Sequence, residues 1–400
     1  MFCWASTAAS CTIPSDSVLQ VLSMPFILKL LAVGLFLHGY VGLRLMPALA
    51  LSPGWQLAGC LVLALSFVLI CSAFLRQRTA QGTWADILSW AGFIALGTFS
   101  FLLVGTFIRD AGLGLVWLLQ GFDPLSAGVL RGSAWAVLIL TLLASLAAVF
   151  NARRLARVKT LEIALSGLPA ALDGLTIVQL SDIHVGPTIK RGYVQGIVDA
   201  ANALQPDIIA LTGDLVDGQT DVLAPHVAPL AGLRARDGVF MVTGNHEYYS
   251  GADAWVAAFR GLGMTVLMNQ HVLIRREAAL LALAGVTDYS GGAFDPAHRS
   301  DPAAAAKGIP EEAVRILLAH QPRSAAAAER VGFRLQLSGH THGGQFVPWN
   351  LFVPMQQPFV AGLKRVGELQ VYISRGTGYW GPPMRLGAPS EITRIRLRTA

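Results

Sequence analysis

Three long apolar stretches without a charged side chain constrain this chain more than any other feature of its sequence. They run from Gly54 to Leu75, from Ile87 to Ile108 and from Gly132 to Phe150. Each approaches or exceeds the roughly 20 residues that a helix needs to cross a bilayer. Only ten of the 30 Lys and Arg and 24 Asp and Glu residues lie in the first 150 positions. The chain is therefore predicted to divide near residue 150 into an all-α transmembrane region and a water-exposed domain.

A fourth apolar stretch, Pro25 to Met46, contains Lys29 and Arg44, whose long side chains can reach the headgroups from helix ends. It brings the prediction to about four spans within residues 25–150. The run Ala111 to Phe122 is apolar but too short to cross. The sequence leaves open whether that run lies in the interface, re-enters the membrane or is the remnant of a fifth span.

Residues 1–24 lack the basic-then-apolar order of a signal peptide and are interpreted as an N-terminal extension, with Met24 as the natural start. Residues 151–172 are interpreted as a basic linker. The positive-inside rule favours a multi-pass protein whose N-terminus and downstream domain are both cytoplasmic, an orientation that a fifth span would reverse. The basic residues on the proposed cytoplasmic side are Arg76, Arg78, Arg153, Arg154, Arg157 and Lys159, against Arg44, Arg109 and Arg131 on the other.

The predicted spans carry little chemistry. His38 is the only histidine among them, and no acidic residue interrupts the three best spans, so no proton relay or ion path is indicated. Anchoring is the favoured interpretation. Glycines such as Gly92, Gly97 and Gly105 fit close helix packing within one chain or between chains, which leaves the oligomeric state open.

Residues 173–400 are predicted to form an α/β domain, because short apolar runs alternate there with helix-like segments. The net charge of +6 is modest for 400 residues and gives no reason to expect nucleic acid. All four cysteines precede residue 72. A metal site in this domain must therefore use His, Asp, Glu or Asn ligands.

Potential metal ligands follow five of the apolar runs. Ligands bind at the carboxyl ends of strands in α/β sheets, so all five loops can contribute to one pocket. Two divalent ions need oxygen and imidazole donors from several directions, and one carboxylate can bridge them. A single Asp-x-His or Gly-Asp is a common turn, but five of the nine histidines fall in these motifs, which makes a purely structural explanation improbable. The motifs are Ser181-Asp182-Ile183-His184, Thr212-Gly213-Asp214, Gly244-Asn245-His246-Glu247, His320-Gln321-Pro322 and Gly339-His340-Thr341-His342.

In this order the motifs resemble those of the calcineurin-like metallophosphoesterase superfamily over roughly Leu175 to Ile395. The resemblance implies a four-layer αββα sandwich that holds two divalent ions, whose identity among Mn, Zn, Fe, Ni and Mg the sequence does not determine. It also implies a metal-bridging hydroxide that attacks phosphorus, with His246 as the general acid. The implied ligands are Asp182, His184 and His342 for one ion, Asn245, His320 and His340 for the other, and Asp214 as the bridge.

The C-terminal segments Gly343-Gly344-Gln345, Ser374 to Gly378 and Pro389 to Ile392 are similar to a membrane-associated branch of that superfamily, which includes UDP-2,3-diacylglucosamine pyrophosphatase-type enzymes. This likeness implies hydrolysis of a phosphodiester or pyrophosphate bond in a membrane-associated or lipid-linked substrate, with membrane lipids as neighbours. Two alternatives stay open. One is a phosphomonoesterase, and the other is a membrane scaffold or transport protein whose soluble domain binds a phosphorylated ligand without turnover.

Several residues near the motifs have more than one interpretation. Glu247 either orients the His246 imidazole, caps a helix or faces solvent, and Arg375 either grips a substrate phosphate or forms a structural salt bridge. Asp217 and Asp288 lie near the motifs and either support the metal ligands or are solvated loop carboxylates; the second is the commoner case, and both are left out of the site. The stretch Phe346 to Val360, which includes Trp349, Phe352 and Phe359, is either a membrane-facing or acyl-chain-binding loop, or ordinary domain packing. His226, His271 and His298 are interpreted as ordinary surface or loop histidines.

Overall fold

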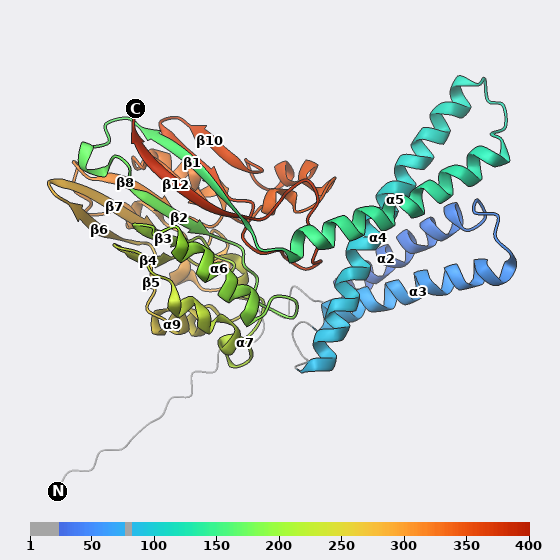
Figure 1. The fold of residues 1–400 in the computed structure, drawn as a ribbon, viewed down its shortest axis with the longest axis horizontal. Helices are drawn as coiled ribbons and strands as arrows, with labels where there is room; N and C mark the ends of the chain where they lie inside the picture. The colour runs from blue at the N-terminus through green and yellow to red at the C-terminus, as the bar shows by residue number, and fades with distance from the viewer. Residues whose placement is uncertain (1–23, 77–81) are drawn as a thin grey trace, which may run out of the picture.

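The computed structural model describes residues 24–76 and 82–400. The predicted extension, except Met24, and Arg78 lie outside the described residues. Four helices make up the first part of the described chain, and each is long and apolar enough to cross a membrane. They lie to one side of the sheet domain (Figure 1). The helices are α2 (Met24–Leu45), α3 (Pro53–Arg76), α4 (Thr83–Leu119) and α5 (Ala127–Arg153).

Helix α4 is longer than a single bilayer crossing requires. It has 37 residues and includes Ala111–Leu119, so this run neither re-enters nor forms a separate element. The chain then turns, and α5 begins after Ser126, whose side chain accepts a hydrogen bond from the Val129 N–H. Asp110, two residues beyond the end of the predicted span, forms ion pairs with Arg44 of α2 at 2.7 Å and with Arg109 at 3.0 Å. This charged group joins α2 to α4 at one end of the bundle.

Small residues bring α3 and α4 into close contact. A Cβ on Gly92 would lie 2.4 Å from the carbonyl oxygen of Leu69 and 2.5 Å from the Cβ of Ala73, so only glycine fits there. His38 stacks on Phe99 with ring centroids 3.6 Å apart. This contact is consistent with packing rather than ion conduction for the histidine of this region.

The rest of the chain forms two six-stranded sheets. Both are mixed: β12 is parallel to β1 but antiparallel to β2, and β10 and β6 are antiparallel to β11 and β7, while the other pairs are parallel. The first sheet has the order β1 (Arg157–Leu165), β12 (Glu391–Thr399), β2 (Thr176–Leu180), β3 (Ile208–Leu211), β4 (Gly238–Met241) and β5 (Thr265–Val266); the second has β10 (Gly362–Val366), β11 (Leu369–Ile373), β9 (Leu335–Ser338), β8 (Val314–Leu318), β7 (Ala279–Gly285) and β6 (Gln270–Arg276).

The two sheets pack face to face and helices cover their outer faces, which confirms the predicted αββα sandwich. Alternate residues of the strands, such as Ile177, Leu283 and Ile316, form the buried layer between the sheets. A second apolar layer lies under the helices of the first sheet, and a third under those of the second. The covering helices are α6 (Arg191–Ala203), α7 (Thr220–Val227) and α9 (Ala252–Gly261) for the first sheet, and α10 (Pro302–Ala306) and α11 (Ala325–Arg330) for the second.

The segment 151–172, predicted as a basic linker, is instead mostly regular structure. Residues 151–153 complete α5, and β1 pairs in parallel with β12 from Arg157↔Glu391 to Leu165↔Thr399. Toward its end the strand alternates exposed and buried residues, and Ile163 and Leu165 are buried between the sheets. The basic residues before the strand and at its start obscure this alternation in the sequence. As a result, the last apolar helix leads within a few residues into the edge strand of the first sheet.

The helical region and the sheet domain contact each other directly. Arg153, the last residue of α5, donates hydrogen bonds from Nη1 to the Thr188 carbonyl and the Tyr379 hydroxyl, each at 2.9 Å. At the start of α4, Asp86 forms an ion pair with Lys190 at 3.1 Å. These contacts place the loop after β2 beside the apolar helices.

Candidate metal centre

The predicted ligands come from loops at the carboxyl ends of parallel strands in both sheets. The ends of β2, β3 and β4 in the first sheet meet those of β8 and β9 in the second. The short helix α8 (Asn245–Tyr249) begins directly after β4 and carries Asn245 and His246. Side chains separated by up to 160 positions in the sequence therefore converge at one edge of the sandwich.

One group of ligand atoms comprises Asp182, His184 and His342, all buried, with the three atoms within 4.8 Å of one another. The Nε2 atoms of His184 and His342 face each other at 3.0 Å, and His342 Nε2 lies 3.5 Å from Asp182 Oδ1. The other ring nitrogen of His184 donates to Asp217 Oδ1 at 2.8 Å, which leaves the Nε2 lone pair directed into the group. A divalent cation fits this concentration of lone pairs.

A second group comprises Asp214, His320 and His340. His320 Nδ1 lies 2.7 Å from the Thr212 carbonyl, and its Nε2 faces Asp214 Oδ2 at 3.1 Å and His340 Nδ1 at 3.2 Å. A carbonyl oxygen only accepts, so the neutral ring presents an Nε2 lone pair to a carboxylate, and such a contact calls for a proton or a cation between them. Asn245 Oδ1 is buried and has no hydrogen-bond partner among the described residues, as expected of a free ligand atom.

Asp214 lies between the two groups. Its Oδ2 atom is 3.1 Å from His320 Nε2 in the second group and 3.9 Å from His184 Nε2 in the first. Its Oδ1 atom accepts a hydrogen bond from the His246 N–H at 2.8 Å. A carboxylate in this place can contact two neighbouring ions at once, as the sequence analysis predicts.

Five of the predicted ligands have left-handed backbone conformations. Such a conformation is unfavourable for any residue other than glycine, at roughly 1–3 kcal/mol each, and tends to occur where function requires it. Neighbouring glycines allow the loops to approach: a Cβ on Gly339 would lie 2.0 Å from Ser181 Oγ, and one on Gly244 would lie 2.2 Å from Asp214 Oδ1. The five φ angles are 52° for Asp182, 57° for His184, 54° for Asp214, 72° for His340 and 51° for His342.

Burial and charge set different protonation states among these groups. Burial raises the pKa of Asp214, but His320 and its histidine neighbours hold that pKa well below its usual range. Burial lowers the pKa of His340 to about 3, and burial also holds that of His342 well below its usual value. Both rings are neutral at pH 7, the form that binds metal. The Asp214 carboxylate outweighs burial at His320 and raises its pKa, so metal binding there displaces a proton.

Asp217 belongs to the site, although the sequence analysis leaves it out. Its side chain is buried, and Oδ1 lies 2.8 Å from Nδ1 of His184 and 2.7 Å from Nδ1 of His246. The interpretation as a solvated loop carboxylate is therefore wrong. Its position three residues after Asp214 in the same strand-end loop was the available signal. Asp288, also set aside as solvated, is fully buried and accepts hydrogen bonds from Ser290 and from Gln321, the neighbour of His320.

Glu247 organises the backbone rather than the His246 ring. The fully buried carboxylate accepts hydrogen bonds from the N–H groups of Gly244 at 2.7 Å, Asp214 at 2.9 Å and Leu215 at 2.7 Å. Of the three interpretations left open, helix capping is correct, and the same carboxylate also ties the β3 loop to the β4 loop. Asp217 takes the place beside His246 that was considered for Glu247.

His246 lies at the edge of the two groups. Burial lowers its pKa, but the carboxylates of Asp214 and Asp217 outweigh burial and raise it to about 9. Asp217 occupies Nδ1, so the N–H on Nε2 is the one available to another group. The rings of Tyr249 and Trp380 lie 5.2 and 5.9 Å from the imidazole, centroid to centroid.

Two arginines near the site have different environments. Arg375 forms an ion pair with Glu391 at 3.5 Å, so of its two interpretations the structural salt bridge is supported. Its side chain is still one-third exposed. Arg385, not singled out from the sequence, is completely buried. Its guanidinium donates to the carbonyls of four residues and has Nη2 3.0 Å from His342 Nδ1, so it holds the last ligand loop. The four carbonyls belong to Gly378, His342, Arg375 and Ala388.

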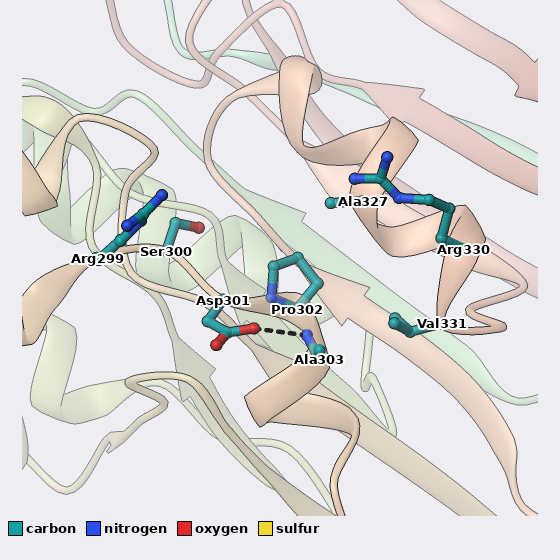
Figure 2. A pocket seen from close by; sticks show the side chains of 8 residues that line it. All are labelled: Arg299, Ser300, Asp301, Pro302, Ala303, Ala327, Arg330 and Val331. Carbon is teal, nitrogen blue, oxygen red and sulfur yellow. Dashed lines mark hydrogen bonds between the residues drawn. The ribbon is translucent and has the colours of Figure 1, made fainter.

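A separate cavity of about 440 Å³ lies away from this centre, between the segment 299–303 and α11. Figure 2 shows its lining, where Asp301 accepts a hydrogen bond from the Ala303 N–H and thereby caps α10. Among the described residues that line it, none is a predicted ligand. Asp301 caps a helix there, and the predicted ligands gather at the strand ends.

The predicted histidines outside the site lie apart from it. His226 is on α7, His271 on β6 and His298 in a short 3₁₀ helix. His298 approaches Asp253 at 3.7 Å, and His271 Nδ1 bonds to the Ala305 carbonyl. None belongs to a ligand group among the described residues.

The fold and the ligand groups define a metallophosphoesterase. Residues 175–344 match the family model described as calcineurin-like phosphoesterase. The chain is 35% identical over 387 residues to a transmembrane protein with metallophosphoesterase domain from Danio rerio, which covers 94% of this chain and 89% of that protein. The chain belongs to the calcineurin-like metallophosphoesterase family, whose members use divalent metals.

Two further relatives point to the same family. A protein of the same description from Bos taurus is 41% identical over 278 residues, covering 67% of this chain and 62% of that protein. An uncharacterized metallophosphoesterase from Campylobacter jejuni is 30% identical over 332 residues, covering 81% of this chain and 84% of its own length. The transmembrane descriptions agree with the four apolar helices.

Proposed function

We propose that this protein is a dinuclear metal-dependent phosphoesterase that hydrolyses a phosphodiester or pyrophosphate bond of a membrane-associated or lipid-linked substrate. The observation that carries the proposal is the position of Asp214 between two groups of ligand atoms, 3.1 Å from His320 and 3.9 Å from His184. A single ion would leave one of these groups unused. Membrane lipids and a phosphorylated substrate are the proposed partners, and the helical region is the proposed anchor.

The residues present fit two divalent ions. Asp182, His184 and His342 would hold one, and Asn245, His320 and His340 the other, with Asp214 shared. Imidazole nitrogens with carboxylate and amide oxygens suit Mn, Zn, Fe, Ni or Mg, and the donor set does not choose among them. The free Oδ1 atom of Asn245 and the left-handed ligand loops support this assignment.

The bound ions would supply Lewis acidity and an activated water. The chain itself supplies the proton that the leaving oxygen needs, because His246 is protonated at neutral pH and presents its Nε2–H. The water oxygen forms the new bond to phosphorus while the bond between phosphorus and the leaving oxygen breaks. The leaving oxygen takes the proton from His246. Asp217 holds the imidazolium in place through Nδ1, so His246 acts as the general acid.

Hydrolysis of bis(p-nitrophenyl) phosphate by the full chain, loaded with Mn²⁺ in detergent, is the direct test. Asp214→Asn and His340→Ala are expected to reduce the rate by roughly 10³-fold or more, because each ion provides several kcal/mol of transition-state stabilisation. His246→Ala is expected to lower the rate while sparing metal content. The same change at His226, a histidine on α7 outside the ligand groups, is the matched control.

Elemental analysis of the same samples separates the alternatives. Two ions per chain and diester hydrolysis support the proposal. Fewer than one ion per chain in correctly folded protein, or no hydrolysis with any divalent ion, would count against it. Hydrolysis of monoesters alone would replace it with a phosphomonoesterase.

We also propose that the catalytic domain is cytoplasmic. If each of the four apolar helices crosses once, the number of crossings is even, and Arg153, Arg154 and Arg157 lie at and just after the end of the last helix. A compartment-sensitive reporter fused to Ala400 is expected to be active only on the cytoplasmic side. Activity on the outer side would overturn this orientation and leave the chemistry untouched.

A further inference from the structure

The loops that follow the last ligands pack against the membrane helices. The Trp349 indole N–H donates to Ser100 Oγ of α4 at 2.8 Å, and the Phe346 ring lies 5.3 Å from that of Phe101. The Arg385 N–H donates to the Ala148 carbonyl of α5 at 2.9 Å. Ser100 and Phe101 lie well inside the apolar run of α4. These loops form the rim of the metal centre. The rim therefore contacts the apolar part of the helices.

This rim exposes large apolar side chains. Trp380, whose ring lies 5.9 Å from that of His246, is 44% exposed, and Met355 is 81% exposed. Soluble surfaces rarely group such residues unless they bind a membrane or a partner. Of the two interpretations of the stretch Phe346 to Val360, a membrane-facing loop fits its first part, whereas Phe359 packs on the core of the second sheet. The exposed rim residues are Val347, Trp349, Leu351, Phe352, Met355 and Trp380.

An apolar groove begins at this rim and runs between α4 and α5. Its cavity of about 660 Å³ is lined on the helix side by residues from Phe101 to Leu113 and from Ser133 to Ala144, and on the domain side by Val347, Pro348 and Leu386. The stretch of α4 that lines it is roughly 18 Å long at 1.5 Å per residue. Ile108 and Leu140, on its lining, are exposed on the surface of the helices. Hydrocarbon surrounds such a groove in a membrane.

A polar cavity adjoins the rim end of the groove. It measures about 260 Å³ and shares Val347 and Leu386 with the groove. Gly343, the neighbour of the ligand His342, and the partly exposed guanidinium of Arg375 line its other side. An apolar channel next to a cationic pocket matches an amphiphile that has a long chain and an anionic head.

Resting on the phosphoesterase activity proposed above, we propose that the groove between α4 and α5 holds the acyl or alkyl chain of a phosphorylated lipid substrate. The chain lies along α4 from Phe101 toward Gly112, and the anionic head lies at the rim near Arg375 and the metal ligands. A lipid fits better than a second protein, because the groove lies at the level of the predicted spans and joins a cationic pocket. The substrate thus enters sideways from the bilayer.

Two glycines of α4 provide a matched test. A Cβ on Gly112 or on Gly114 would meet no described atom within 4 Å, so both positions accept a larger side chain, but only Gly112 lines the groove. Gly112→Phe fills the far end of the groove, and Gly114→Phe is the control. Both are assayed in identical nanodiscs with methyl p-nitrophenyl phosphate and hexadecyl p-nitrophenyl phosphate.

We expect wild-type protein to prefer the hexadecyl ester, and Gly112→Phe to lower kcat/KM for that ester about tenfold while leaving the methyl ester unchanged, because filling the groove removes buried chain contacts. Gly114→Phe is expected to match wild type with both esters. Equal kcat/KM for the hexadecyl ester in both variants would refute the proposal that the groove binds the lipid chain, and the phosphoesterase assignment would stand.

A binding experiment on wild-type protein is independent of catalysis. Phosphatidic acid with a diazirine in one acyl chain is cross-linked in nanodiscs, and the adducts are mapped by mass spectrometry. Adducts concentrated in residues 101–113 and 133–144 support the groove, even if no ester is hydrolysed and the proposed activity fails. Adducts spread evenly over the exposed faces of α2 and α3 would refute it.

Discussion

Glycines occupy the tightest contacts in both parts of the molecule, but the groups they bring together differ. In the helical region Gly92 lets α4 approach the backbone of α3, and the atoms in contact are a carbonyl and a methyl group. In the metal centre Gly339 lets one ligand loop approach another, and the atoms in contact are Ser181 Oγ and an oxygen of the ligand Asp182. The first contact sets how two helices pack, whereas the second sets where the ligands lie.

The two parts also use their buried polar groups differently. Charged contacts between the helices gather at one end, around Asp110. In the catalytic domain a buried network joins Asp214, Asp217, Glu247 and the histidines at the centre of the sandwich edge. A local change in the helical region should therefore alter stability, while one in the network should alter chemistry. Four predictions test that distinction.

The largest effect is expected for Gly339→Ala. The new methyl group would lie 2.0 Å from Ser181 Oγ and 2.2 Å from Asp182 Oδ2, so the loops must separate. A displacement of about 1 Å in a catalytic group can reduce the rate by roughly 10²-fold. We expect at least that loss in diester hydrolysis, with reduced metal content. Gly192→Ala, an open position on α6, should leave both measurements unchanged.

A smaller effect is expected for Asp217→Asn. Loss of a carboxylate that orients metal-binding histidines typically reduces metal affinity or activity by about 10- to 100-fold. Removal of its negative charge also lowers the pKa of His246, which must be protonated to act as an acid. The alkaline limb of the kcat profile should therefore begin at a lower pH than in wild type. If the alkaline limb of the kcat profile begins at the same pH as in wild type, Asp217 has only a structural role.

In the helical region, Gly92→Ala is expected to act on stability alone. The methyl group would lie 2.4 Å from the Leu69 carbonyl oxygen, and overpacking of this kind destabilises by about 1–3 kcal/mol. Thermal unfolding in detergent should show the loss, whereas metal content and hydrolysis of a soluble diester should stay within twofold of wild type. Gly114→Ala is the neutral partner. A large loss of activity with Gly92→Ala would show that helix packing controls the metal centre.

The smallest effect concerns a surface ion cluster of the catalytic domain. Burial raises the pKa of Asp207, but the Thr176 N–H and Arg276 outweigh it and lower that pKa. An aspartate whose pKa is lower in the folded than in the unfolded state stabilises the folded state above the unfolded-state pKa of about 3.9. This stabilisation is lost as the pH falls through the folded-state pKa. Wild type should thus exceed Asp207→Asn in unfolding free energy by about 1 kcal/mol at pH 7. The difference should shrink steadily below pH 4, and a constant difference would contradict the linkage.

Much of the fold could be predicted because the relevant signals are local. Uncharged stretches of about 20 residues indicate the four helices, and buried strands that end in Asp, Gly or His motifs indicate the sheets. The edge strand β1 was not predicted, because Arg157 and Lys159 make its first half look like a charged linker and only Ile163 and Leu165 near its end are buried. Its pairing with β12 is a property of the folded chain. The continuation of α4 to Leu119 was not predicted, because the length of an apolar run alone does not say where a helix ends.

The metal centre was predictable where a motif carries its own chemistry, as in Asp182-Ile183-His184. Residues that act through another residue were not. Asp217 and Arg385 gain their roles from partners 29 or more positions away, His246 and His342, and no local pattern marks either contact. Glu247 had three interpretations until the N–H groups of the β3 loop were placed against it.

The amino-acid sequence by itself determined which segments are apolar enough to enter a membrane and which side chains are able to bind a metal, because hydropathy and ligand chemistry belong to individual residues. The tertiary structure alone decided that Asp217 joins two histidines, that Glu247 ties the β3 loop to the β4 loop, and that the rim after His342 meets α4 and α5. These are relations between atoms distant in the chain. Sheet pairing and helix docking create them, and they exist only in the folded molecule.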